Sequence, residues 1–187
     1  MTTPHGGQLT LPVSDRDHVQ GPSTAPVTLV EYGYYECPYC GAAYSIVKRL
    51  QERLADRLRF VFRNFPLTTV HPHAEHAAES AEAAGAQGKF WEMHDYLYQH
   101  QRALKDGDLN EYAAALGLDV EQFDREMTEQ VHTDRVRADF MSGVRSGVNG
   151  TPTFYIIGFH HNGAYDFDSL LAAIEAAISE SAARPAR

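Results

Sequence analysis

The sequence contains little cysteine and comparatively little positive charge. Of its 187 residues two are cysteines, and 16 Lys and Arg stand against 25 Asp and Glu. The formal net charge of −9 argues against nucleic acid or an anionic membrane surface as a partner. The chain has no run of 18 or more apolar residues, so we expect no membrane insertion.

The first twenty residues also lack the signs of a targeting segment. They read MTTPHGGQLTLPVSDRDHVQ, in which no basic stretch is followed by an apolar one. We therefore expect a cytoplasmic location, although a trimmed periplasmic chain would look the same. With 43% hydrophobic and 11% aromatic residues, the chain fits one domain, or one domain with an insertion.

Both cysteines fall in a single Cys-Pro-Tyr-Cys motif at positions 37–40. Residues 27–32 before it are rich in β-branched and aromatic side chains, which predicts a buried strand. Apolar residues recur at helical spacing from residue 42 onward. Pro38 suits the first position of a helix, where its missing N–H costs no hydrogen bond. The pattern predicts Cys37 at a helix N-terminus, with the second cysteine one turn behind it.

This position of Cys37 favours redox chemistry. Unpaired N–H groups and the macrodipole at a helix start favour a negative charge, and thiols in such places have a pKa of about 3.5–7.5 instead of about 8.5. Thiolate is the form that attacks disulfides, and Cys40 is close enough to close a disulfide afterwards. Glu36 places a carboxylate beside Cys37, and we expect it to moderate the lowering of the Cys37 pKa.

Two other interpretations of the motif are open. A structural disulfide that closes so short a loop would stabilise the fold by only about 2 kcal/mol. A zinc site needs two more ligands, and the chain has no further cysteine. We favour redox activity, because a cysteine pair in a reducing compartment is more often catalytic than structural.

Further along the chain, three segments predict the rest of a sheet and a closing helix. Residues 58–64 alternate apolar and polar side chains, which predicts a second strand and a strand–helix–strand unit with parallel strands. Strand character returns at residues 153–157, and the turn residues after them predict a hairpin whose second strand spans about 161–165. A last helix is expected after a cap at Asp166 or Asp168.

The other segments carry no clear sheet pattern. Residues 1–25 are polar and rich in proline and glycine, which predicts an irregular arm on the surface with a short edge strand near residues 8–11. The pattern of apolar residues in 69–146 predicts helices and no strand. These are expected at residues 72–87, 90–100, 108–116 (capped by Asp108), 120–127 and 131–144.

Histidines gather at two places. His71, His73 and His76 lie close in sequence, but a metal site would need further ligands, so we interpret them as solvated residues at a helix start. We expect His160 and His161 to occupy the hairpin turn.

The order of these elements resembles a thioredoxin fold with an inserted helical domain, as in the DsbA-like thiol–disulfide oxidoreductases. Residues 36–40 are similar to the active site of that family, and residues 88–94 to a segment of its helical insertion. Residues 148–154 and 163–165 resemble its cis-proline loop and the segment that follows. The resemblance implies an α/β fold class, with a thioredoxin-like fold and an inserted all-helical domain. The expected domains are an irregular N-terminal arm at 1–25, a thioredoxin-like domain at 26–68 and 147–181, and the helical insertion at 69–146.

The same resemblance implies a set of site residues. Cys37 and Cys40 are the expected catalytic pair of a protein-disulfide oxidoreductase, as nucleophile and resolving cysteine. To these we add Glu36, which its position beside Cys37 leads us to expect as a residue that tunes the Cys37 pKa. A cis Thr151–Pro152 bond would leave the Thr151 backbone able to pair with an extended client peptide. We expect no metal and no cofactor beyond the redox-active Cys37–Cys40 disulfide. The expected substrate-binding residues are Pro38, Tyr39, Thr151 and Pro152.

The expected partners are protein or peptide clients with thiols or disulfides, and an unidentified redox partner. The Pro-Tyr dipeptide of the motif departs from the Pro-His of the founding DsbA proteins and is typical of glutaredoxins. One alternative is therefore a glutaredoxin-like reductase that uses a low-molecular-weight thiol, and another is a non-catalytic binding or chaperone module. Several relatives carry an acidic residue in place of Tyr34, so the resemblance assigns no proton-transfer role to Tyr34.

Overall fold

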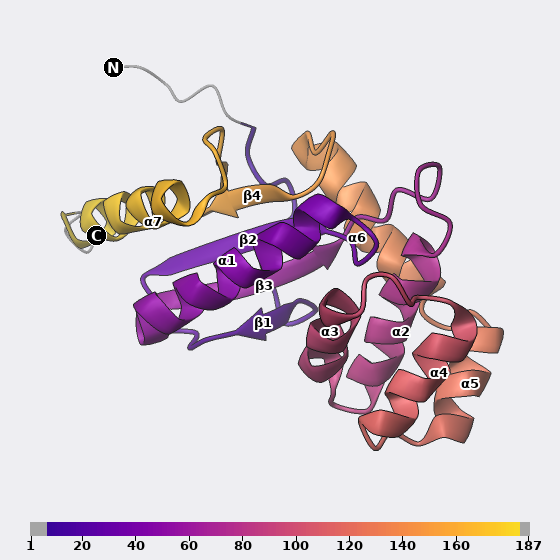
Figure 1. Cartoon of the computed structure of the whole chain (residues 1–187). Coiled ribbons are helices and arrows are strands. Elements are labelled where there is room, and N and C mark those ends of the chain that lie inside the picture. The colour runs from indigo at the N-terminus through magenta and orange to yellow at the C-terminus, as the bar shows by residue number, and fades with distance from the viewer. Residues whose placement is uncertain (1–6, 184–187) are drawn as a thin grey trace. The chain divides into compact units, whose positions relative to one another are not determined.

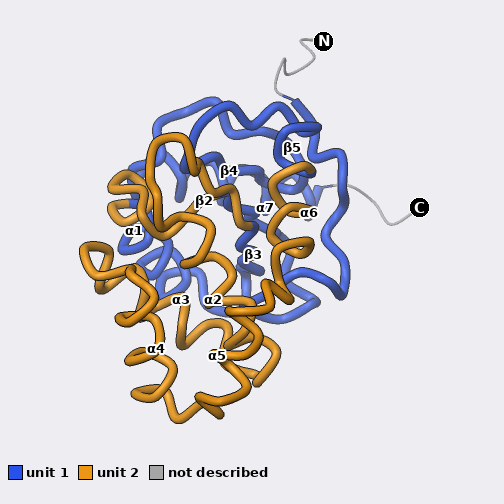
Figure 2. Tube along the Cα trace, turned by 90° about the vertical axis from the view of Figure 1, so that its right-hand side faces the viewer, with its two compact units in different colours: residues 1–32, 43–63, 142–187 blue, residues 33–42, 64–141 orange. Residues whose placement is uncertain are grey.

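The computed structural model describes residues 7–183, so residues 1–6 of the expected arm lie outside it. The chain forms two compact units, coloured separately in Figure 2. Unit 1 comprises Met1–Tyr32, Ala43–Arg63 and Ser142–Arg187, and unit 2 comprises Gly33–Ala42 and Asn64–Met141. The cysteine motif belongs to unit 2, together with the helices that follow the second predicted strand.

A five-stranded mixed sheet with the order β1-β3-β2-β4-β5 forms the core of unit 1. The central strand β2 pairs antiparallel with β4, with Leu29 opposite Ile156 and Tyr32 opposite Thr153. The strands predicted at 27–32, 58–64 and 153–157 are confirmed to within one residue. The strands are β1 His18–Gln20, β2 Val27–Gly33, β3 Leu58–Asn64, β4 Thr153–Ile156 and β5 Phe159–His160.

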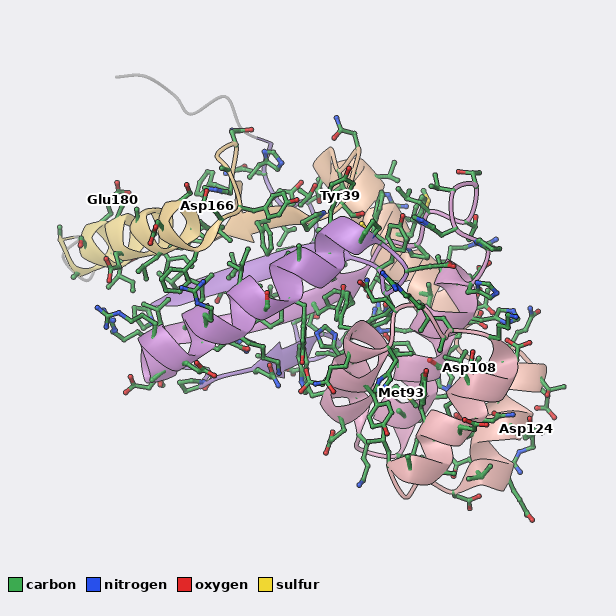
Figure 3. All side chains as sticks on the ribbon, in the orientation of Figure 1. Tyr39, Met93, Asp108, Asp124, Asp166 and Glu180 are labelled. Carbon is green, nitrogen blue, oxygen red and sulfur yellow. The ribbon has the colours of Figure 1, made fainter. Side chains whose placement is uncertain are left out.

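Two helices complete the layers of unit 1. Helix α1 spans Pro38–Leu54, and its later turns cross one face of the sheet over β2 and β3 (Figure 1). Helix α7 spans Phe167–Ala183 and contacts β4. Asp166, labelled in Figure 3, caps α7, because its Oδ1 accepts a hydrogen bond from the Ser169 amide at 3.0 Å. The predicted start of α1 at Pro38 is confirmed.

The predicted hairpin is present, but its second strand was placed wrongly. β5 covers Phe159–His160 instead of residues 161–165, so His160 is a strand residue. Ile157 (φ 49°) and Gly158 (φ 79°) make a two-residue turn with positive φ at both positions. A β-branched residue seldom adopts that conformation, so the pattern assigned Ile157 to the strand and moved the turn downstream.

The N-terminal arm also differs from the prediction. The expected strand near residues 8–11 is reduced to a single bridge between Gln8 and Phe159, and the edge strand of this region is β1. Arg63, which is fully buried, anchors the arm. Its guanidinium donates to both carboxylate oxygens of Asp17, at 2.8 and 3.1 Å, and to the Leu11 carbonyl at 2.9 Å. Burial of this charge is possible because several acceptors converge on it.

Unit 2 is built from helices, and the chain from residue 67 to residue 147 contains no strand. Helix α2 packs against α3, α4 and α5, and its buried alanines allow close approach. Asp108 was expected to begin α4, but the helix begins at Asp106, and Asp108 accepts a hydrogen bond from the Lys105 amide at 3.0 Å within a capping box. The helices are α2 Ala74–Ala86, α3 Phe90–Gln99, α4 Asp106–Ala115, α5 Val120–Thr128 and α6 Thr133–Ser146, whose last residues belong to unit 1.

A buried charged cluster ties α2 and α6 to the end of β3 within unit 2. The Asn64 amide donates to Asp139 at 3.0 Å, and the Asn64 side chain donates to Glu82 at 2.9 Å. Arg135 binds Asp139 and lies 3.8 Å from Glu82. Burial raises the pKa of Asp139 to about 6, although the charge of Arg135 opposes this shift.

Asp139→Asn should change how stability depends on pH. Because the Asp139 pKa is raised from 3.8 to about 6, the folded state binds the proton more tightly than the unfolded chain. Below pH 3.8 the proton on Asp139 therefore stabilises the folded state by about 3 kcal/mol. This stabilisation is lost as the pH rises through about 6. Urea unfolding between these two pH values should show a flatter profile in Asp139→Asn than in the wild type. Asp134→Asn, at an exposed position of the same helix, is the control. Parallel profiles for wild type and Asp139→Asn would contradict the assignment.

Candidate active site

The two cysteines lie at the start of α1. Cys37 directly precedes Pro38, the first residue of the helix, and the Cys40 amide donates to the Cys37 Sγ at 3.4 Å. Neither cysteine is joined in a disulfide. Cys37 keeps 3% of its surface exposed and Cys40 none, so Cys37 is the more accessible of the two thiols. This geometry is the one that the sequence predicts for a nucleophile and a resolving thiol.

The two residues between the cysteines are exposed. Tyr39 has 64% of its surface accessible, and Figure 3 labels it at the first turn of α1. Pro38 is exposed beside it. Both are placed where a client that approaches Cys37 would meet them, and their role in binding stays a prediction.

Gln101 holds the loop that enters α1. Its Nε2 donates to the carbonyl oxygens of Tyr35 and Cys37, at 2.7 and 2.8 Å. A Cβ at Gly41 would collide with the Gln101 side chain, so glycine at this position leaves room for the contact. No local pattern could have predicted this role, because Gln101 lies 60 residues from Gly41 and no motif connects them.

An aromatic cluster from α3 supports the same loop. The Tyr35 hydroxyl is hydrogen-bonded to His94 Nδ1 at 3.1 Å, and the Tyr35 ring lies 4.9 Å from that of Tyr98. His94 is buried and meets the Trp91 ring edge to face at 5.0 Å. The segment at residues 88–94 therefore acts on the site through packing with residue 35.

The histidines at residues 71–76 have separate partners. His71 Nδ1 lies 2.7 Å from the Tyr34 hydroxyl, and His76 Nδ1 lies 2.7 Å from Asp106. The Glu36 carboxylate binds the His73 amide at 2.8 Å and the His73 Nδ1 at 2.9 Å. Within residues 7–183, no group of three or more His, Cys, Asp or Glu side chains that could hold a metal is found. The expected effect of Glu36 on the Cys37 pKa stays a prediction.

The Thr151–Pro152 bond is cis, as the resemblance implies. It lies just before β4 and borders an open hollow of about 390 Å³ in unit 1. The hollow is also lined by Gly150, Phe154, His161 and Tyr165. Thr151 and Pro152 belong to unit 1, whereas Cys37 and Cys40 belong to unit 2, so their action as one site stays a prediction.

A cysteine pair at a helix start, a mixed sheet and a cis-proline before β4 together define a thioredoxin-like fold. The chain belongs to the family described as "Thioredoxin", which residues 13–176 match. BdbD from Bacillus subtilis superposes with a TM-score of 0.82 at 24% identity, over 93% of this chain and 97% of that one. A thioredoxin-like oxidoreductase from Silicibacter pomeroyi gives 0.79 at 28% identity, over 89% and 94%. Wolbachia pipientis alpha-DsbA1 gives 0.78 at 18% identity, over 93% and 96%. These neighbours confirm the predicted DsbA-like resemblance and fold class.

Curated relatives of similar sequence are much longer proteins. Na(+)/H(+) antiporter NhaA 1 of Salinispora arenicola is 47% identical over 178 residues, which is 95% of this chain and 27% of the antiporter. NhaA 1 of Mycobacterium sp. strain KMS is 44% identical over 178 residues, 92% of this chain and 29% of that protein. The chain thus spans little more than a quarter of these relatives. Among residues 7–183, none of the helices has the length and apolar character needed to cross a membrane.

Proposed function

We propose that the chain is a thiol–disulfide oxidoreductase that exchanges disulfides with protein clients through Cys37 and Cys40. The observation that supports this most strongly is the position of Cys37 at the N-terminus of α1, with the Cys40 amide 3.4 Å from its sulfur. Amide groups at a helix start stabilise a thiolate. The similarity to a thioredoxin-like oxidoreductase from Silicibacter pomeroyi supports the same chemistry.

The proposed reaction is a pair of exchanges. The Cys37 thiolate attacks a client disulfide, so a Cys37–client bond forms and one client thiolate leaves. The Cys40 thiolate then attacks the Cys37 sulfur, which forms the Cys37–Cys40 disulfide and releases the second client thiolate. The client gains two electrons and the cysteine pair loses them. In the reverse direction the disulfide oxidises a dithiol client, and no cofactor beyond the pair is required.

Substitution of each cysteine should separate the two steps. Cys37→Ser should abolish insulin reduction, because no nucleophile remains. Cys40→Ser should accumulate mixed disulfides, because attack still occurs but resolution does not. The readouts are turbidity of reduced insulin and mass spectrometry of trapped adducts. Insulin reduction by Cys37→Ser at the wild-type rate would contradict the proposal. If Cys40→Ser reduces a glutathione mixed disulfide at full rate, the glutaredoxin-like alternative is favoured instead.

We assign client binding to Pro38 and Tyr39 beside the cysteines and to Thr151 and Pro152 beside the hollow of unit 1. The argument for the second pair is that a loop bordering an open hollow can receive an extended peptide by backbone pairing.

Gly150→Leu tests this assignment without altering the loop's own residues 151 and 152. A Cβ at Gly150 meets nothing within 4 Å, so the new side chain starts in open space, where it would occupy room needed by a client. Peptide disulfide exchange should slow about tenfold, as a loss of about 1.4 kcal/mol of client binding would cause. Alkylation of Cys37 by iodoacetamide should be unchanged. Gly107→Leu, also with open space around its Cβ, is the matched control. Equal exchange rates in the two variants would remove Thr151 and Pro152 from the client site.

We also propose that the chain acts beside a Na(+)/H(+) antiporter. The support is that proteins named Na(+)/H(+) antiporter NhaA 1 contain a segment similar to this chain, 47% identical in Salinispora arenicola and 44% identical in Mycobacterium sp. strain KMS. Covalent attachment gives a domain an effective concentration near the millimolar range at its neighbour. In vesicles that contain an NhaA-type antiporter, oxidised and reduced forms of the chain should produce at least a twofold difference in Na(+)/H(+) exchange rate. The Cys37→Ser/Cys40→Ser protein is the control. Identical rates with all forms would refute this partnership.

A further inference from the structure

Three polar groups of unit 2 follow one another beside the nucleophile. Tyr34 is buried, with 2% of its surface exposed. On one side its hydroxyl lies 2.7 Å from His71 Nδ1, and on the other it is hydrogen-bonded to the Cys37 side chain. A hydroxyl has one proton and two lone pairs, so it can donate to one neighbour while accepting from the other. Hydrogen bonds therefore connect the Cys37 thiol, the Tyr34 phenol and the His71 imidazole without a gap.

The phenol in this chain stays protonated. Burial raises the pKa of Tyr34 far above its usual value, and the nearby Cys37, Cys40 and Glu36 raise it further. The charged or titratable groups that act on Tyr34 are these three and His71, while Glu36 is itself held by His73. A phenolate is thus excluded as an intermediate, and Tyr34 can move a proton only by accepting one as it gives up another.

We propose that Tyr34 relays a proton from the Cys37 thiol to His71 when the nucleophile is formed. The inference rests on the proposed function, because it concerns the same thiolate. The Cys37 S–H proton passes to the Tyr34 oxygen while the Tyr34 O–H proton passes to His71 Nδ1. The products are a thiolate, a neutral phenol and an imidazolium, with both hydrogen bonds reversed. His71 now donates to Tyr34, and Tyr34 donates to the Cys37 sulfur.

The surroundings of His71 suit the role of proton acceptor. Its side chain is half-buried, so a proton taken from the site can pass on to water. Neutral imidazole is the side chain that most readily accepts a proton near neutral pH. The imidazolium also places a positive charge in the same hydrogen-bonded chain as the thiolate, which favours thiolate formation. Because a neutral tyrosine passes the proton on, the relay works without burying a second negative charge, as a carboxylate at position 34 would require.

The test is the pH profile of Cys37 alkylation by iodoacetamide, with Cys40→Ser in every protein so that only one thiol reacts. The compared variants are Tyr34→Phe, His71→Gln, the double variant, and His76→Gln as the matched control, since His76 binds Asp106 instead. His71→Gln removes the imidazolium, and Tyr34→Phe removes the hydrogen bond that connects it to the thiolate. Each change should raise the midpoint of Cys37 alkylation by about 1 pH unit. The double variant should add little, because both changes break one relay. His76→Gln should leave the midpoint where it is.

His71→Gln separates proton transfer from a merely structural contact. Glutamine can still hydrogen-bond to the Tyr34 hydroxyl, but it cannot accept the proton. An unchanged midpoint in His71→Gln would overturn the relay, as would additive effects in the double variant. In addition, the NMR signal of the His71 ring should titrate together with thiolate formation and lose that coupling in Tyr34→Phe. Failure of the proposed function would look different, because client exchange would then be absent while the alkylation profiles could still shift.

Discussion

The structure of the site depends on how the segment entering α1 is held. The Phe65 amide donates to the Gly33 carbonyl at 2.8 Å, and Gln101 binds the carbonyls of Tyr35 and Cys37. His71 and His73 bind the side chains between these points. Backbone carbonyls in a loop need such partners when they lose water. Residues of unit 2 thus hold the loop of the candidate site, and residues 33–42 group with them in the same compact unit.

These contacts connect the helices of unit 2 to the environment of the Cys37 thiol. The helix start supplies the field that favours a thiolate, and its direction is fixed only if the residues before Pro38 are fixed. Residues of α3 and of the segment before α2 provide that constraint through one aromatic cluster and two histidine contacts. A change in these helices that leaves both cysteines in place would therefore still affect the reactivity of Cys37.

The parts that could be predicted from sequence are those set by local pattern. Pro38 at a helix start and the alternation at residues 58–64 are local signals, and both elements were found where expected. The contacts that could not be predicted join residues far apart in the chain, such as Gln101 with Gly41 and Tyr34 with His71. The prediction of the hairpin turn failed for a different reason. Ile157 has a positive φ, whereas isoleucine favours strands. Local pattern thus placed the two cysteines at the start of a helix. Their polar neighbours could be identified only from the folded structure.

The central claim is that Cys37 and Cys40 form a reversible redox pair, and a redox titration tests it most directly. The protein is equilibrated in glutathione buffers of graded ratio, thiols are alkylated, and mass spectrometry counts them. The account predicts one two-electron transition between dithiol and Cys37–Cys40 disulfide, with a midpoint between roughly −270 and −120 mV, the range of thioredoxin-fold proteins. A chain in which both thiols stay reduced, or only mixed disulfides with glutathione form across the whole range, would contradict it.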